Sequence, residues 1–347
     1  MENLNITLHI TEKCNLKCKY CYITAKNKSM DWEIAKQAIN FVSSLSNKSI
    51  ILSLTTAEPL LEWALIKRII EYAEGRGVKR FDLATNGVLL NKNILKYLTK
   101  HNVVLQLSFD GRQPEHDSFR FFRNNQKTSQ VLDEKLNLIK EHYNNNIEIR
   151  VTFVPKTVKY LADTVSYLVE KKFCSKMRIN LVPVVQCRWR EVDFRVLSEQ
   201  LFIIADLFIK SYWDGKPINI CSSECIPKQY HLLNIYKYRD SEEMFCNVGH
   251  EIISIGPDGK IWPCYWLGAS KFRQKNKLCL GQLNNKEINY YKARQLIFPK
   301  RSPFLSCRVW NYLLNGDSME PVYVYKQNYK IWYNVSKYVN QEIYKND

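Results

Sequence analysis

Six short apolar runs alternate with amphipathic segments over residues 1–213, and this alternation restricts the possible folds more than any other feature of the chain. The runs have the length and β-branched content of buried strands, while the intervening segments repeat apolar residues at helical spacing. We expect strands at 6–11, 50–55, 80–85, 103–109, 147–155 and 177–183. We expect helices at 31–45, 60–75, 91–101, 128–144, 158–172 and 196–212.

In repeated βα units each helix carries the chain back to the end of the sheet where the previous strand began, so the strands are parallel. The crossover between them is right-handed. Six units in about 190 residues predict an α/β fold of the partial (β/α)6, TIM-like barrel type, or else a doubly wound sheet. In both arrangements the active site lies at the carboxyl ends of the strands.

The pattern changes at residue 214, where cysteine, aromatic and turn residues replace the βα alternation. The segment SIGPDGKIWPC predicts a β-hairpin with its turn at 257–259. We therefore expect a barrel at 1–213, a small C-terminal β-hairpin/α domain at 214–320 and a basic, aromatic tail at 321–347. The tail is expected to pack on the body as a strand or a helix.

Three cysteines, Cys14, Cys18 and Cys21, lie in the segment CNLKCKYC directly after the first expected strand. Thiolates at this spacing reach three corners of one iron–sulfur cluster from a single loop. The fourth iron then has no protein ligand and is open to coordination by a bound cofactor. A structural zinc site is the alternative, although a closed zinc site needs four ligands.

CNLKCKYC resembles the motif of the radical S-adenosylmethionine (SAM) superfamily, in which an aromatic residue, here Tyr20, precedes the last cysteine. The resemblance implies a [4Fe–4S] cluster on Cys14, Cys18 and Cys21 that reduces SAM and releases a 5′-deoxyadenosyl radical. That radical abstracts a hydrogen atom from a substrate, while the protein supplies position and shielding. An external electron donor such as flavodoxin or ferredoxin is also implied.

Further motifs follow the expected strands in the order that this family has them. The segment Thr56-Ala57-Glu58-Pro59 stands where the family usually has Gly-Gly-Glu-Pro, so both glycines are replaced at a close backbone approach. LATNGVLL and LSFDG resemble the motifs after strands three and four, and the resemblance covers residues 4–190. It implies that the following residues surround SAM: Tyr20, Glu58, Thr85, Asn86, Ser108 and Asp110.

The later cysteines resemble those of an auxiliary-cluster module. Cys246, Gly259 and Cys264 follow the pattern Cys-x12-Gly-x4-Cys, which opens the SPASM module and its shorter relative, the twitch domain. Cys307 follows, but Trp310 stands where the next twitch cysteine falls. The resemblance implies one auxiliary [4Fe–4S] cluster held by Cys246, Cys264 and Cys307. Its fourth ligand is left open among Cys221, Cys225, Cys279 and an iron site open to substrate.

The chain is strongly basic, with 51 Lys and Arg against 34 Asp and Glu and a formal net charge of +17. Such a charge attracts anionic partners at long range. The resemblance to SPASM and twitch proteins implies a maturase of ribosomally made peptides, an anaerobic sulfatase-maturing enzyme or a dehydrogenase of small sugars. The leading hypothesis is modification of a ribosomally made precursor peptide with an acidic leader, by crosslink formation or epimerisation. The alternatives are a small-molecule dehydrogenase, RNA modification and a non-catalytic iron–sulfur protein.

No apolar run is long enough for a membrane span or a signal peptide, so we expect a cytoplasmic protein. Eleven cysteines in a reducing compartment indicate metal binding rather than disulfides. The residues His9, His101 and His116 are expected to be structural or solvated.

Overall fold

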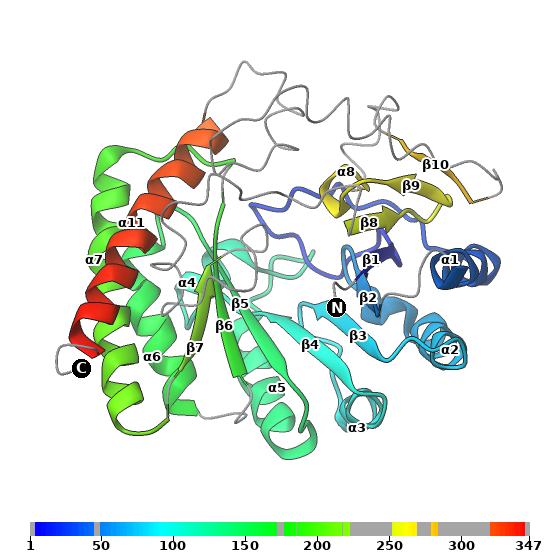
Figure 1. Ribbon diagram of the computed structural model, residues 1–347, viewed down its shortest axis with the longest axis horizontal. Helices are drawn as coiled ribbons and strands as arrows, with labels where there is room; N and C mark the ends of the chain where they lie inside the picture. The colour runs from blue at the N-terminus through cyan, green and yellow to red at the C-terminus, as the bar shows by residue number, and fades with distance from the viewer. Residues whose placement is uncertain are drawn as a thin grey trace. The chain divides into compact units, whose positions relative to one another are not determined.

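The computed structural model describes residues 4–44, 49–171, 177–184, 186–216, 218–222, 252–268, 279–283 and 320–343 (Figure 1). The chain divides into two compact units. The first unit comprises residues 1–107, 120–146 and 247–301, and the second comprises 108–119, 147–246 and 302–347. Neither unit is a continuous stretch of the chain.

The first unit is built on a sheet in which β1 to β4 are neighbours in chain order. The pairs β1–β2, β2–β3 and β3–β4 are parallel. This sequential order is that of a barrel rather than of a doubly wound sheet. These strands are β1 (Leu4–His9), β2 (Ile50–Thr55), β3 (Arg80–Thr85) and β4 (Val103–Ser108), the last ending at the start of the second unit.

The helices of the first unit bury one apolar stripe each. In α2, for example, Ile66, Ile69, Ile70 and Ala73 are fully buried, which is the i, i+3, i+4, i+7 spacing of one helix face. These elements are α1 (Trp32–Ser44), η1 (Pro59–Glu62), α2 (Trp63–Glu74), α3 (Lys92–Lys100) and α5 (Ser129–His142).

The expected hairpin is present and extends the sheet on the free side of β1. Strands β8 (Ile252–Ile255) and β9 (Lys260–Trp262) are antiparallel, and Gly259 adopts a φ of 76° at the turn, where glycine has no steric penalty. β8 pairs with β1 in parallel, while the short β10 (Gly281–Gln282) pairs with β9. A short helix, α8 (Tyr265–Gly268), follows β9.

The second unit has a parallel three-stranded sheet in the order β5, β6, β7. Its apolar core includes the side chains of α11 at 332, 335, 339 and 343, all buried, and α11 packs along α7 (Figure 1). These elements are α4 (Glu115–Phe119), β5 (Ile147–Phe153), η2 (Val158–Tyr160), α6 (Leu161–Lys171), β6 (Met177–Pro183), α7 (Glu191–Trp213), β7 (Asn219–Ser222) and α11 (Glu320–Ile343).

Some expectations from sequence need correction. The first strand begins and ends two residues earlier than expected, and α7 begins at Glu191 rather than at 196. The expected tail is a helix, since α11 covers most of it. Within the described part of the chain, no helix is both long enough and apolar enough to cross a membrane.

Candidate active site

The three-cysteine loop connects the end of β1 to the start of α1, and its two ends lie side by side. Its two sides are joined by backbone hydrogen bonds, from Glu12 N to Lys28 O at 2.7 Å and from Met30 N to Ile10 O at 2.8 Å. The Thr11 and Ser29 hydroxyls are also hydrogen-bonded, at 2.7 Å. The base of the loop is therefore fixed, and the cysteines lie beyond it.

Hydrogen-bond donors approach two of the three thiols. Leu16 N lies 3.4 Å from Cys14 Sγ and Asn86 Nδ2 lies 3.9 Å from it, while Arg120 Nη1 lies 3.9 Å from Cys18 Sγ. Cys21 is exposed. N–H groups directed at sulfur stabilise thiolate ligands, so this donor set fits an iron–sulfur cluster.

Burial raises the pKa of the Cys14 thiol to about 12, and the charges of Glu58 and the two other cysteines act in the same direction. Ionisation of this thiol is therefore linked to binding of a cationic group. Among the described residues, no three His, Cys, Asp or Glu side chains are already gathered as metal ligands.

Glu58 links the loop after β2 to the loop after β3. It is fully buried, and its carboxylate accepts hydrogen bonds from Thr85 Oγ1 at 2.7 Å, Asn86 N at 2.7 Å and Leu60 N at 3.1 Å. Burial raises its pKa to about 7, against the opposing effect of these donors and of the Arg120 charge. The structure thus brings together Glu58, Thr85 and Asn86, three of the residues expected around SAM.

Asn86 connects this network to the cysteine loop. Its Nδ2 donates to Asn15 Oδ1 at 2.8 Å and lies next to Cys14 Sγ, while Glu58 N donates to Lys13 O at 3.0 Å. Three loops that follow β1, β2 and β3 are therefore held at one edge of the sheet.

Thr56 and Ala57 keep the backbone conformation that the replaced glycines would adopt freely. Their φ angles are 90° and 49°, in the left-handed region. For the β-branched Thr56 this conformation is strained. The loop shape is thus retained at a conformational cost.

Arg120 and Arg123 are site residues that the sequence analysis missed. Arg120 is buried, approaches Cys18 and lies over the Tyr20 ring at 5.3 Å, while Arg123 Nε donates to Cys14 O at 2.7 Å. They come from a segment about 100 residues further along the chain, so no local pattern indicates them. The charge of Arg120 compensates part of the negative charge that three thiolates bring.

Ser108 and Asp110 belong to the second unit. Asp110 is buried, its Oδ1 accepts from Thr152 N at 2.9 Å and its backbone N donates to His116 Nδ1 at 3.2 Å. Asp110 thereby joins the segment after β4 to β5. His116 is fully buried at this junction.

The later cysteines are described only in part. Cys264 is buried beside the hairpin, and its carbonyl accepts from Ser254 Oγ at 2.9 Å. Cys279 Sγ lies 3.2 Å from Gly281 O, within reach of a thiol hydrogen bond. Cys221 is on β7. The other expected or candidate ligands, Cys225, Cys246 and Cys307, lie outside the described residues.

A family model described as the radical SAM superfamily matches residues 8–168, the segment that carries the cysteine loop and the Glu58 network. The chain carries a radical SAM domain. Proteins of this superfamily use a [4Fe–4S] cluster with SAM, and the residues around Cys14 fit that pair.

Two curated relatives share this radical SAM segment. The chain is 32% identical to the uncharacterized protein MJ0907 of Methanocaldococcus jannaschii over 169 residues, which cover 48% of this chain and 58% of that protein. It is 28% identical to the radical SAM cyclopropyl synthase TigE of Paramaledivibacter caminithermalis, over 39% of this chain and 34% of TigE. The matches thus span between about a third and somewhat over half of these relatives.

Solved structures show a fold likeness that extends beyond the radical SAM domain. Native anSMEcpe with bound AdoMet aligns with a TM-score of 0.76 at 17% identity, over 99% of this chain and 100% of that one. The same protein with AdoMet and the Cp18Cys peptide gives 0.74 at 18% identity, over 98% and 99%. Streptococcus suis SuiB bound to its precursor peptide SuiA gives 0.56 at 17%, over 78% and 61%. The likeness confirms the α/β class and is consistent with a partial barrel.

Proposed function

We propose that this protein is a radical SAM maturase that cleaves SAM reductively and abstracts a hydrogen atom from a ribosomally made peptide. The observation that carries the proposal is the Cys14 loop, whose thiols face N–H donors and whose neighbour Asn86 joins it to the buried Glu58 network. With the cluster and SAM bound, the site would supply a 5′-deoxyadenosyl radical.

The residues of the chain have separate tasks in this proposal. Cys14, Cys18 and Cys21 would hold the cluster, and Tyr20 would pack near the adenine. The Glu58 network fixes the backbone at 58–60 and 85–87, and Thr85, Asn86, Ser108 and Asp110 complete the surroundings of SAM. Arg120 and Arg123 hold the cysteine loop and place positive charge beside the cluster.

A peptide substrate is supported by fold and by charge. The fold resembles those of anSMEcpe and SuiB, which are solved with bound peptides. Residues 265–347 contain 14 Lys and Arg against 5 Asp and Glu, which suits an acidic leader. The reaction that we propose on the peptide is crosslink formation or epimerisation.

We also propose one auxiliary [4Fe–4S] cluster on Cys246, Cys264 and Cys307, in a module at 214–320. Its support is the hairpin, after which Cys264 lies two residues beyond the end of β9 and is buried. An electron donor of the flavodoxin or ferredoxin type and a cytoplasmic location complete the proposal.

Anaerobic reconstitution with iron and sulfide tests both clusters. We expect about eight irons per chain, and about four after Cys14→Ala, Cys18→Ala and Cys21→Ala are combined. We expect 5′-deoxyadenosine to form only when SAM, a reductant and a short acidic peptide encoded beside this protein are all present. The matched control is Cys187→Ala, which removes a half-buried thiol of the second unit.

Each outcome discriminates between functions. About four irons in the unaltered protein would contradict the auxiliary cluster. A reduced cluster without any 5′-deoxyadenosine would indicate a non-catalytic iron–sulfur protein. Production of 5′-deoxyadenosine with small molecules and not with peptides would favour a dehydrogenase or another small-molecule enzyme.

A further inference from the structure

Positive charge is concentrated around the cysteine loop. Residues 13–28 and 120–128 together contain eight Lys and Arg and no Asp or Glu. Six of these eight side chains are exposed, namely those of Lys17, Lys19, Lys26, Lys28, Arg123 and Lys127. Because neither segment contains a carboxylate, their charge is not neutralised from within, and such a surface attracts an anionic partner.

The backbone joins the two segments into one surface of the first unit. Lys17 N donates to Phe121 O at 2.9 Å, and Phe121 forms an antiparallel bridge with Lys127. The Lys19 ammonium group lies 5.7 Å from the centroid of the Phe121 ring. Three exposed lysines from two distant segments thus gather around Phe121. We call Lys17, Lys19 and Lys127 the lysine patch.

The lysine patch belongs to the same loop as the proposed cluster ligands. Lys17 and Lys19 flank Cys18 in the chain. Arg120, which directly precedes Phe121, approaches the Cys18 thiol at 3.9 Å. A protein that docks on this patch is therefore brought to the loop that would hold the cluster.

Two classes of anionic partner match this charge, an acidic electron carrier and an acidic leader peptide. Electron transfer becomes slower steeply with distance, so a carrier must dock beside the loop that holds the cluster. A leader can bind farther away, because the chain that joins it to the modified residue spans the distance. Complexes between redox proteins are small, and complementary charge steers their formation. The location of the patch thus favours the carrier.

We propose that the lysine patch docks an acidic one-electron carrier protein of the flavodoxin or ferredoxin class. One electron leaves the carrier, which is oxidised, and enters the cluster, which is reduced, and no bond forms or breaks. The inference rests on the proposed function for the presence of the cluster. It adds the surface through which that cluster receives its electron.

Binding of oxidised flavodoxin to the reconstituted protein tests the patch without SAM cleavage. Fluorescence anisotropy of labelled flavodoxin at 50 mM salt measures the affinity. We expect Lys17→Gln, Lys19→Gln and Lys127→Gln, combined in one triple variant, to weaken binding about tenfold, because three exposed charge pairs are lost.

The matched control removes the same charge elsewhere in the first unit. Lys92, Lys96 and Lys100 are exposed along α3, and replacing all three by Gln should leave the affinity for flavodoxin unaltered. A double variant, Lys17→Gln with Lys127→Gln, serves if the triple variant does not take up iron. We expect the double variant to weaken binding about fourfold.

A second readout separates docking from damage to the cluster. Dithionite is a small reductant that needs no docking surface. We therefore compare the rate of 5′-deoxyadenosine formation with limiting reduced flavodoxin to the rate with dithionite, in the presence of SAM and the peptide. The ratio of the two rates should fall about tenfold in the triple variant and stay the same in the α3 control.

The proposal is wrong if the unaltered protein does not bind flavodoxin, or if the triple variant and the α3 control bind it equally well. It is also wrong if the triple variant loses affinity for a ten-residue glutamate peptide but not for flavodoxin, since the patch then binds an acidic leader. Flavodoxin binding needs no SAM, so it can be established even if 5′-deoxyadenosine never forms. Conversely, SAM cleavage with dithionite but without flavodoxin binding would remove only the docking surface.

Discussion

Glu58 is enclosed by donors from Leu60, Thr85 and Asn86, yet the pKa of its carboxyl group is raised to about 7. The cost of desolvating the charge outweighs the stabilisation from three hydrogen bonds. A carboxyl group in this state is close to half ionised at neutral pH. It can therefore respond to charge that arrives nearby when a ligand binds.

This raised pKa predicts a pH-dependent stability that Glu58→Gln removes. The folded state keeps the proton up to about pH 7, whereas the unfolded carboxyl loses it near 4.5. Stability contributed by Glu58 is therefore full below about pH 4.5 and is lost as the pH rises through 7, by up to about 3 kcal/mol. Urea unfolding at pH 5 to 8 measures the difference between the two proteins. Parallel pH profiles would contradict the assignment.

Thr56 gives a prediction about stored strain. At a φ of 90° a β-branched residue is more strained than Ala57 is at 49°, a common left-handed value. Thr56→Gly should stabilise the protein by about 1 kcal/mol, because relief of strain exceeds the added entropy of the unfolded chain. Ala57→Gly should be close to neutral and serves as the matched control. Equal effects in denaturant unfolding would show that Thr56 is not strained.

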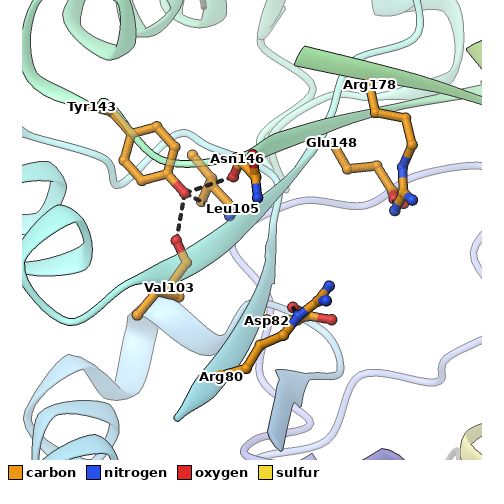
Figure 2. Close-up of polar contacts among 8 residues, drawn as sticks. All are labelled: Arg80, Asp82, Val103, Leu105, Tyr143, Asn146, Glu148 and Arg178. Atoms are coloured by element: carbon orange, nitrogen blue, oxygen red, sulfur yellow. Dashed lines mark hydrogen bonds and ion pairs between the residues drawn. The ribbon is translucent and has the colours of Figure 1, made fainter. Parts of the chain in front are cut away.

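At the scale of single elements, β4 depends on a side chain from the end of α5. The buried Tyr143 hydroxyl accepts from Leu105 N at 2.9 Å and donates to a backbone carbonyl, with Val103 O and Asn146 O both in reach (Figure 2). Tyr143→Phe should cost about 2 kcal/mol, since it leaves buried backbone groups without this partner. Denaturant unfolding measures it. Tyr97→Phe, at a more exposed hydroxyl, is the control with a smaller expected loss.

The elements that sequence predicted well are those whose signal is local. The strands at 50–55, 80–85 and 177–183 agree at both ends, because alternating apolar residues mark each of them locally. The pairing of β8 with β1 joins segments about 250 residues apart, and periodicity carries no such information. The start of α7 was missed since its N-cap is Arg190, which Asp193 holds in place of a usual capping residue.

The residues of the candidate site likewise fall into those with a local sequence signal and those without one. Cys14, Glu58 and Asn86 were predictable because each lies in a short motif directly after a strand, and a parallel sheet brings such positions to one edge. Arg120 and Arg123 were not predictable, since their roles arise from contacts across about 100 residues. Neither was the ion pair of Glu148 with Arg178, because strand register alone makes these two residues neighbours.

At the scale of the whole molecule, the net charge of +17 predicts that the protein binds an acidic peptide in preference to a neutral one. Attraction between exposed charges is screened within about 10 Å at 0.1 M salt. An acidic leader should therefore bind quickly and in a salt-dependent manner. A neutral peptide should be insensitive to salt.

Fluorescence anisotropy tests this salt dependence. The labelled ligands are a ten-residue glutamate peptide, a glutamine peptide of equal length and a single-stranded RNA of similar charge. We expect the glutamate peptide to lose about tenfold in affinity between 50 and 500 mM salt, because that range removes most of the long-range attraction. The glutamine peptide should bind weakly throughout. Tighter binding of the RNA than of the glutamate peptide at every salt concentration would mean that the basic surface recognises phosphates and stacked bases, and would favour RNA modification over peptide maturation.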